Sequence, residues 1–147
     1  MQTLFLDTEF THLTAERRLI SLALVDPSGA EFYVELNDGW SPFDCSEFVQ
    51  RIVLPQLDLP RHGRNRADAA RALGDFLAGY AAVEIVSDAL DWDWPLLLDL
   101  LEELPAHVRS REDAALLRDL DEAEVPHHAL LDARLMSGSA ERRRQKR

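Results

Sequence analysis

The pattern of hydrophobic and polar positions predicts three strands in the first quarter of the chain. Residues 2–6 form a short apolar run typical of a buried strand, and residues 19–25 form a second one. The turn signal Asp-Pro-Ser-Gly at residues 26–29 separates the second run from residues 31–36, whose alternation predicts the returning strand of a hairpin. The chain is therefore expected to begin with three consecutive strands.

Helical and extended patterns alternate in the middle of the chain. Asp44 is placed to cap a short helix that Pro55 stops. Apolar positions at i, i+3, i+4 and i+7 predict one buried face of a helix over residues 66–80. Residues 83–86 are apolar and too few for a helix, so they are predicted to form a central strand.

The last third of the chain continues this alternation. Residues 92–104 are predicted to form a leucine-rich helix with Pro95 in its first turn, and residues 107–110 a fifth, short strand. A final helix is expected to begin near His128 and to fade by residues 137–139. Strands that come first and then alternate with helices indicate an α/β fold with a mixed sheet, in a single domain over residues 1–140.

Composition narrows the class of protein. The hydrophobic share of 46% and the charged share of 29% are typical of a globular protein, and no apolar run approaches the ~20 residues of a membrane span. The first residues carry neither a basic stretch nor a cleavage site, so we expect no signal peptide. Cys45 is the one cysteine, which excludes an internal disulfide and favours a cytoplasmic location.

The formal net charge of −11 is unevenly distributed. Five of the sixteen basic residues lie in residues 141–147, a basic tail expected to be disordered, so residues 1–140 hold eleven basic and twenty-six acidic residues. Such a body repels a polyanion, and a nucleic-acid partner would need metal ions or local cations. The one basic cluster, from Arg61 to Arg71, is either a solvated loop or a contact for substrate phosphates.

Carboxylates gather where two predicted strands end. Asp7 and Glu9 share a face of the first strand, and two such groups repel each other unless a cation lies between them. Residues 83–86 lead into Asp88, Asp91 and Asp93, and sites in α/β sheets form at the carboxyl ends of central strands. These acids are therefore candidate metal ligands; the alternatives are a solvated strand end and acids that favour a helix N-terminus.

A third candidate segment opens the last helix. His128 and Asp132 are four residues apart and share a helix face, whereas His127 and Asp132 do not, so spacing alone favours His128. If the helix begins after His127, however, that histidine lies on an entry segment and can approach the acids independently. A solvated helix cap is the simpler reading of either histidine.

Taken together, these segments resemble the three exonuclease motifs of the DEDD superfamily in its histidine subclass, which includes proofreading exonuclease subunits, RNase T and oligoribonuclease. The first motif matches as Asp7-Thr8-Glu9, and the third as His127 with Asp132 five residues later. The second and loosest motif is matched best by Trp-Asp-Trp-Pro-Leu-Leu at residues 92–97, which favours Asp93 over Asp91 and Asp88. The resemblance spans residues 4–136.

The resemblance implies an RNase H-like fold with a mixed five-stranded sheet flanked by helices. It also implies 3′–5′ hydrolysis of single-stranded nucleic acid to nucleoside 5′-monophosphates, and we expect RNA to be favoured over DNA. Within the superfamily, the chain looks most like the small bacterial exoribonuclease-like proteins. Two divalent cations, Mg²⁺ or Mn²⁺, would be held by Asp7, Glu9, Asp93 and Asp132, and oxygen ligands suit both ions. A homodimer is expected by analogy with relatives.

The remaining roles fall on residues beside the acids. His127 would be the general base, since an ordinary histidine pKa of about 6.5 suits proton transfer near neutral pH. Phe10 and Thr11 are placed to contact the terminal nucleotide, Phe10 by stacking on its base; packing in the core is an equal alternative for Phe10.

Two rival functions share these residues. A haloacid-dehalogenase-like phosphatase would use Asp7 as its nucleophile, because residues 7–11 come within one substitution of Asp-x-Asp-x-Thr. That family needs a lysine at the phosphoryl group, and the one lysine here is Lys146; the reading also leaves His127 and Asp132 without a role. The other rival is a nucleic-acid-binding module with a dead site.

Overall fold

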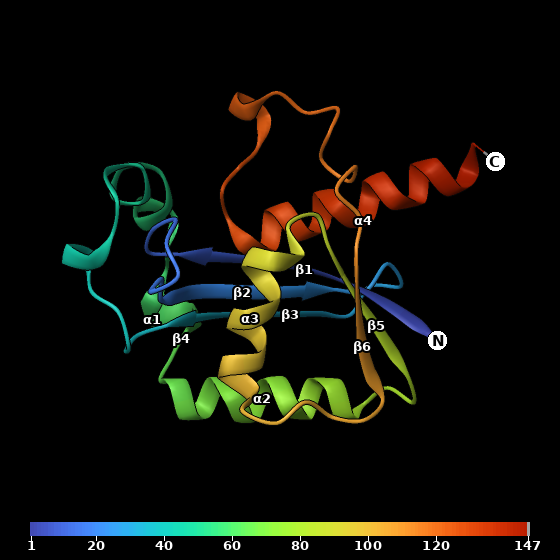
Figure 1. Ribbon diagram of the computed structural model, residues 1–147, viewed down its shortest axis with the longest axis horizontal. Helices are drawn as coiled ribbons and strands as arrows, with labels where there is room; N and C mark the ends of the chain where they lie inside the picture. Colours follow the sequence, from blue (N-terminus) through green and yellow to red (C-terminus); the bar gives the residue numbers. More distant parts are fainter. Residues whose placement is uncertain (147) are drawn as a thin grey trace.

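The computed structural model describes residues 1–146, and its central feature is a six-stranded sheet with the order β4-β3-β2-β1-β5-β6 (Figure 1). Strands β1, β2 and β3 form an antiparallel meander, whereas β5 runs parallel to β1, β6 parallel to β5, and β4 parallel to β3. The strands are β1 (Gln2–Phe10), β2 (Leu19–Val25), β3 (Glu31–Leu36), β4 (Gly63–Arg64), β5 (Val83–Ser87) and β6 (Val108–Glu112). The predicted mixed α/β sheet is confirmed.

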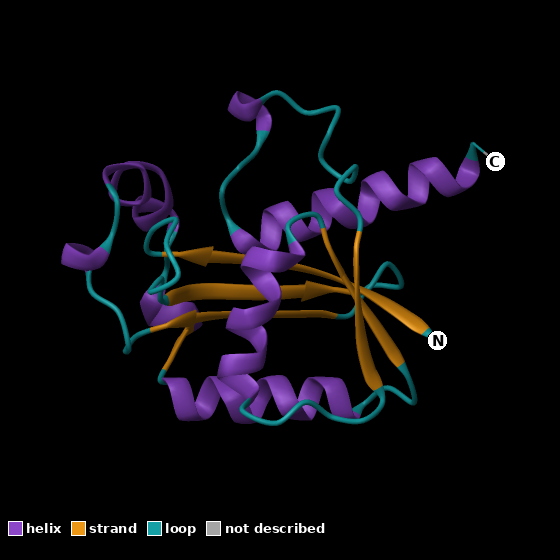
Figure 2. Ribbon diagram, viewed as in Figure 1, coloured by secondary structure: helices purple, strands orange, loops and turns teal. Residues whose placement is uncertain are grey.

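Helices cover both faces of this sheet (Figure 2). The helices are α1 (Leu59–His62), α2 (Arg66–Ala78), α3 (Leu90–Leu101) and α4 (Ala129–Gln145), with short helical segments η1 (Pro42–Asp44), η2 (Val49–Val53), η3 (Leu54–Gln56) and η4 (Glu122–Glu124). Asn65 caps α2 by accepting a hydrogen bond from the Asp68 amide. Across residues 1–146, no helix combines the length and apolar character that a membrane span requires.

The alternation of side chains along β1 assigns the two faces. Leu4 and Leu6 pack in the cluster that contains the buried leucines of α2 and α3, whereas Phe5 packs with the alanines of α4 on the other face. By the same alternation, Asp7 and Glu9 point toward the α4 side, and Thr8 points toward α3. Strand β1 therefore presents its acids to one helix and a hydroxyl to another.

The sheet has six strands and not the five expected. The additional strand, β4, pairs only Gly63 and Arg64 with the end of β3, and two residues leave no periodic signal in the sequence. Gly63 allows the tight exit from α1, because a Cβ atom there would lie 2.5 Å from the Leu59 carbonyl oxygen. The expected fifth strand, β6, is present and runs to Glu112.

Two predicted helices differ in their form. The segment after Asp44 is not one regular helix but a series of irregular turns, η2 and η3 among them. Helix α4 was expected to fade by residues 137–139, but it continues through Ser137 and Gly138 to Gln145. Residues 141–145 of the expected disordered tail are thus helical, supported by an ion pair between Arg143 and Asp113; Arg147 lies outside the described residues.

Candidate active site

A cavity of about 630 Å³ lies over the carboxyl ends of β1 and β5. Two excursions of the chain border it: the segment around η2, and the long connection from β6 to α4 that rises above the sheet in Figure 1. Its acidic lining residues are Asp7, Glu9, Asp88, Asp93, Glu122 and Asp132. Its apolar lining residues are Phe10, Leu13, Phe48, Val49, Leu117 and Val125. The cavity therefore combines a carboxylate floor with apolar walls.

The carboxylates form two groups that share Asp7. Asp7, Glu9 and Asp132 can each present an oxygen so that the three oxygens lie within 4.8 Å of one another. Asp7, Asp88 and Asp93 can do the same. Strand β1, the start of α3 and the first turn of α4 therefore bring together all four predicted ligands, and Asp88 joins them.

Burial raises the pKa values of these acids, and for Asp7 and Glu9 the neighbouring charges raise them further. Burial raises the pKa of Asp7 well above its usual value, and the charges of Asp93, Glu9 and Asp132 raise it further. Burial, followed by the charges of Asp132 and Asp93, does the same to Glu9. Burial raises the pKa of Asp132 to about 6. A cation bound among these carboxylates would therefore stabilise their ionised forms.

Asp93 is held by hydroxyl groups at both of its oxygens. Thr8 Oγ1 donates to Oδ1 and Ser87 Oγ donates to Oδ2, each over 2.6 Å. Burial raises the pKa of Asp93 to about 7, against the opposing effect of these two hydrogen bonds. Sequence reasoning missed both hydroxyls, although Thr8 lies inside the first motif.

The structure separates the three candidates for the third acid. Asp93 and Asp88 both reach the cavity, whereas Asp91 is exposed outside it, and its backbone carbonyl accepts a hydrogen bond from Arg17. The match to the second motif favours Asp93 over Asp88. The turn between β5 and α3 nevertheless carries its side chain to the carboxylate floor.

The two adjacent histidines lie in different environments. Helix α4 begins at Ala129, so His127 lies on the entry segment, and its side chain lines the cavity against the edge of Phe48. His128 instead stacks on Tyr33 with the ring centroids 5.0 Å apart. Burial lowers the pKa of His128. Helix spacing alone favours His128, but of the two histidines it is His127 that lines the cavity with the acids.

The two predicted substrate contacts have different outcomes. Phe10 lines the cavity and also stacks on Trp92, with ring centroids 5.8 Å apart, so it combines a core contact with an accessible position. Thr11 is completely buried: its hydroxyl accepts from the Arg18 amide, and its carbonyl accepts from Ser46. The expected direct contact of Thr11 with a substrate is therefore wrong, because these bonds turn the residue inward.

The residues present suit hard divalent cations. Within residues 1–146, the buried oxygens Asp7 Oδ2 and Asp132 Oδ1 have no hydrogen-bond donor, although most buried polar atoms in folded proteins are paired. The atoms available as metal ligands are all carboxylate oxygens, and Mg²⁺ and Mn²⁺ prefer oxygen ligands. The cluster therefore fits a divalent-metal site.

Comparisons with known proteins bear on the fold. No model of a known family matches the chain, and no curated protein matches it in sequence. Among solved structures, cell-death related nuclease 4 (CRN-4) is similar over 99% of this chain, with a TM-score of 0.67 and 14% identity; the match spans 64% of that protein, less than two thirds of its length. The Mg²⁺- and Mn²⁺-bound form of Pop2p from S. pombe is similar over 98% of this chain and 83% of that one, with a TM-score of 0.66 and 14% identity. At this identity the likeness extends to the fold alone, and the chain has an RNase H-like α/β fold.

Proposed function

We propose that the protein is a metal-dependent 3′–5′ exonuclease of single-stranded nucleic acid, with RNA favoured over DNA. The observation that carries the proposal is the position of Asp7, which belongs to both carboxylate groups in a cavity that His127 also lines. A shared ligand between two groups is the arrangement expected for two adjacent ions. The solved structures with this fold include a nuclease and a form bound to Mg²⁺ and Mn²⁺.

The proposed roles follow from these positions. Asp7, Glu9, Asp93 and Asp132 would hold the two ions, with Asp88 as a further ligand or as a support for Asp93. When bound, divalent ions neutralise the negative charge that develops on the attacking and leaving oxygens of a phosphodiester. The chain's own carboxylates cannot supply that neutralisation, because they carry the same sign as the substrate.

His127 would move the proton. His127 lines the same cavity as the carboxylates, so its ring could accept a proton from the attacking water and release it to solvent. The apolar contact with Phe48 restricts the ring without occupying either nitrogen. This arrangement supports the proposed general base.

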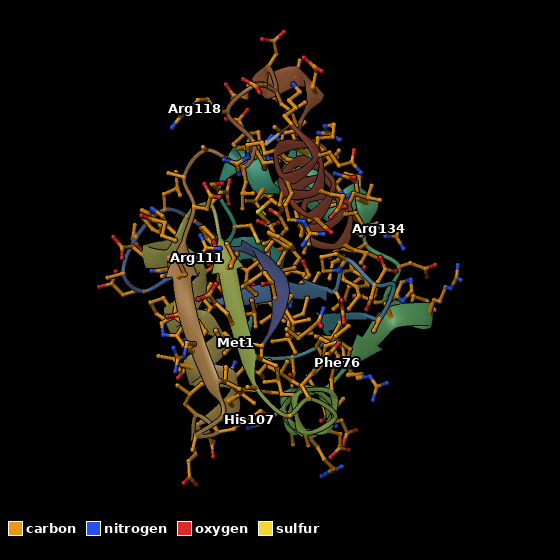
Figure 3. All side chains as sticks on the ribbon, turned by 90° about the vertical axis from the view of Figure 1, so that its right-hand side faces the viewer. Met1, Phe76, His107, Arg111, Arg118 and Arg134 are labelled. Carbon is orange, nitrogen blue, oxygen red and sulfur yellow. The ribbon has the colours of Figure 1, made fainter. Side chains whose placement is uncertain are left out.

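The cavity walls suit the end of a single strand. Among the described residues, no lysine or arginine lines the cavity, and the walls offer Phe10 and Phe48 to a base. The arginines labelled on β6 and α4 in Figure 3 pair elsewhere, Arg111 with Glu84 and Arg134 with Glu31. Recognition of a duplex through a wide cationic groove is thus disfavoured.

A degradation assay with two labels tests the proposal. A 5′-labelled RNA oligomer incubated with Mg²⁺ or Mn²⁺ should give a ladder of products shortened one nucleotide at a time, and a 3′-labelled one should release labelled mononucleotide at once. Asp7→Ala should abolish both. A matched DNA oligomer measures the expected preference for RNA. Cleavage from the 5′ end, or ladders that persist in Asp7→Ala, would contradict the proposal.

The same assay separates the rival functions. A phosphatase with Asp7 as nucleophile requires a cation on the phosphoryl group, and the described residues place no lysine or arginine in the cavity. Release of phosphate from a small monoester without shortening of RNA would favour it. Tight RNA binding without any cleavage would favour a dead module. The proposed homodimer, which rests on analogy, is tested by sedimentation velocity.

A further inference from the structure

The backbone of His127 adopts a conformation that the residue does not favour by itself. Its φ angle is 55°, in the left-handed region that costs L-residues free energy. Histidine enters this region more often than most side chains, but any residue other than glycine does so uncommonly. The next residue, His128, returns to an extended conformation and begins α4 as its N-cap. Such a backbone persists only where neighbouring groups hold it in place.

The side chain of Gln56, at the end of η3, supplies that support. Gln56 Nε2 donates to the Pro126 carbonyl over 2.8 Å and lies 3.3 Å from the His127 carbonyl, so the amide holds the peptide groups on both sides of the His127 Cα. The same nitrogen donates to the Ile52 carbonyl over 2.9 Å, which ties it to its own segment. Gln56 thus reaches across 70 residues of sequence to the entry of α4.

The segment that carries Gln56 is itself fixed to the sheet. Two residues after Gln56, the Asp58 amide donates to Glu35 Oε1 over 2.8 Å. Glu35 is completely buried on β3 and also accepts a hydrogen bond from the Tyr33 hydroxyl. Tyr33 in turn stacks on His128. The buried carboxylate of Glu35 therefore anchors both the Gln56 segment and the residue that follows His127.

We propose that Gln56 is a positioning residue for His127, holding the strained entry of α4 so that the imidazole faces the carboxylate floor. This inference rests on the proposed function, in which His127 transfers the proton. Gln56 does not line the cavity, so its effect on the reaction is transmitted through His127. Gln56 restricts the backbone at His127. Phe48 restricts the side chain, because the two rings are in contact with a centroid distance of 4.9 Å.

A double-mutant cycle tests the inference. The kcat and KM of the wild type, Gln56→Met, His127→Ala and the double variant are measured on a 5′-labelled single-stranded RNA oligomer at saturating Mg²⁺. Gln56→Met keeps the length of the side chain and removes the donor. We expect it to lower kcat about tenfold and to leave KM little changed, because a displaced base costs rate rather than binding. In the His127→Ala background the same substitution should leave kcat unchanged.

The chain offers a matched control. Gln50 lies in the same segment, and its Nε2 donates to the Pro42 and Cys45 carbonyls and not to the Pro126 or His127 carbonyl. Gln50→Met should therefore leave kcat at the wild-type value. Should Gln56→Met fail to fold, Gln56→Leu also removes the donor without placing a charge against the carbonyl groups, and it serves in its place.

An NMR measurement on the metal-free protein gives a readout independent of activity. Gln56→Met should shift or broaden the ring ¹H–¹⁵N signals of His127 and leave those of the distant His107 unchanged. Equal loss of kcat in both backgrounds, or unaltered kcat and His127 signals in an active Gln56→Met protein, overturns the inference. If the wild type does not shorten RNA, the proposed function fails, and the NMR comparison still decides whether Gln56 holds the ring.

Discussion

Thr8 Oγ1 donates a hydrogen bond to Asp93 Oδ1 over 2.6 Å, and this bond links the first acidic motif directly to the second. Ser87 Oγ makes the equivalent bond to Oδ2 from the parallel neighbour β5. Strands β1 and β5 thus each donate one hydrogen bond to the carboxylate of Asp93 on α3. Within residues 1–146, Asp7 and Asp132 each have a buried carboxylate oxygen with no hydrogen-bond donor. Asp93 is therefore the acid whose carboxylate is already held in place without a bound metal.

The first prediction concerns this hydroxyl. Thr8→Val preserves the shape of the side chain and leaves a buried carboxylate oxygen without its donor, which should lower the free energy of unfolding by about 1–3 kcal/mol. Urea denaturation of the metal-free protein measures the loss. Thr8→Ser keeps the hydroxyl and should stay closer to the wild type. Equal stability of Thr8→Val and the wild type would contradict the bond's importance.

The second prediction concerns the pH dependence of the metal-free protein. Asp7 and Glu9 have strongly raised folded pKa values, and those of Asp93 and Asp132 are about 7 and about 6. Between about pH 4, where unfolded carboxyl groups ionise, and about pH 7, the folded chain therefore binds more protons than the unfolded chain. Its free energy of unfolding should fall as the pH rises through this window, by an amount on the order of a few kcal/mol.

Urea denaturation in EDTA at several pH values between 4.5 and 7.5 measures the fall. Asp7→Asn should flatten it and should raise stability at pH 7.5, because it removes a buried charge among like charges. The lowered pKa of His128 acts in the opposite direction near pH 6, and this term cancels in the comparison with Asp7→Asn. If stability instead rose with pH in the wild type and not in Asp7→Asn, the carboxylates would not repel one another as proposed.

The third prediction distinguishes the two histidines. His127→Ala should lower kcat by about 10²–10⁴-fold and leave the free energy of unfolding nearly unchanged, since general-base catalysis contributes on that scale. His128→Ala should keep most of kcat and lose about 0.5–1.5 kcal/mol of stability, because the stack on Tyr33 is lost. Steady-state kinetics and urea denaturation on both variants decide. A greater loss of kcat in His128→Ala would assign the base to His128.

The elements predicted well from sequence are those with local signals. Strands β2 and β3 match their predicted bounds because a turn signal separates two apolar runs. Asp7, Glu9, Asp93 and Asp132 could be proposed as one set from the motif resemblance, and the cavity brings them together. Each of these strands and each of the three motifs is recognised from about ten consecutive residues or fewer.

The features that sequence reasoning missed depend on tertiary contacts. Gln56 contacts Pro126 across 70 positions, and a single amide in an irregular segment gives no periodic signal. Strand β4 exists only through its pairing with β3. Thr11 was expected in the site from its place after the motif, but the shift in register between Glu9 and Phe10 and the bonds to Arg18 bury it. Spacing along a chain cannot show where a bulge redirects it.

The fourth prediction concerns Arg17, which compensates for a proline in α3. Pro95 was expected in the first turn of its helix, but α3 begins at Leu90, so the proline lies in the second turn and cannot donate to the Asp91 carbonyl. Arg17 lies 3.4 Å from that carbonyl oxygen and donates to the Trp92 carbonyl over 2.8 Å, with its guanidinium over the Trp92 ring. Arg17 thus stabilises the turn that leads to Asp93.

Arg17→Met should lower the free energy of unfolding by about 1–2 kcal/mol and speed amide hydrogen exchange in the first turns of α3. Arg17→Lys should recover little of this, because an ammonium group cannot reproduce the planar contact with ring and carbonyls. Arg18→Met is the control, since the exposed Arg18 side chain makes no such contact within residues 1–146. Unchanged exchange in Arg17→Met would show that the proline needs no such partner.

The fifth prediction concerns salt. The cavity walls are apolar, and within the described part of the chain no lysine or arginine lines them, so few substrate phosphates are paired with cationic side chains. For single strands, log(kcat/KM) should fall with log[KCl] with a slope of about −0.7 for each phosphate paired in this way. We expect a slope shallower than about −0.7 at constant Mg²⁺, because among the described residues no lysine or arginine lines the cavity to make such a pair. A slope steeper than about −2 would instead implicate the basic cluster, and Arg61→Gln with Arg64→Gln should then make it shallower.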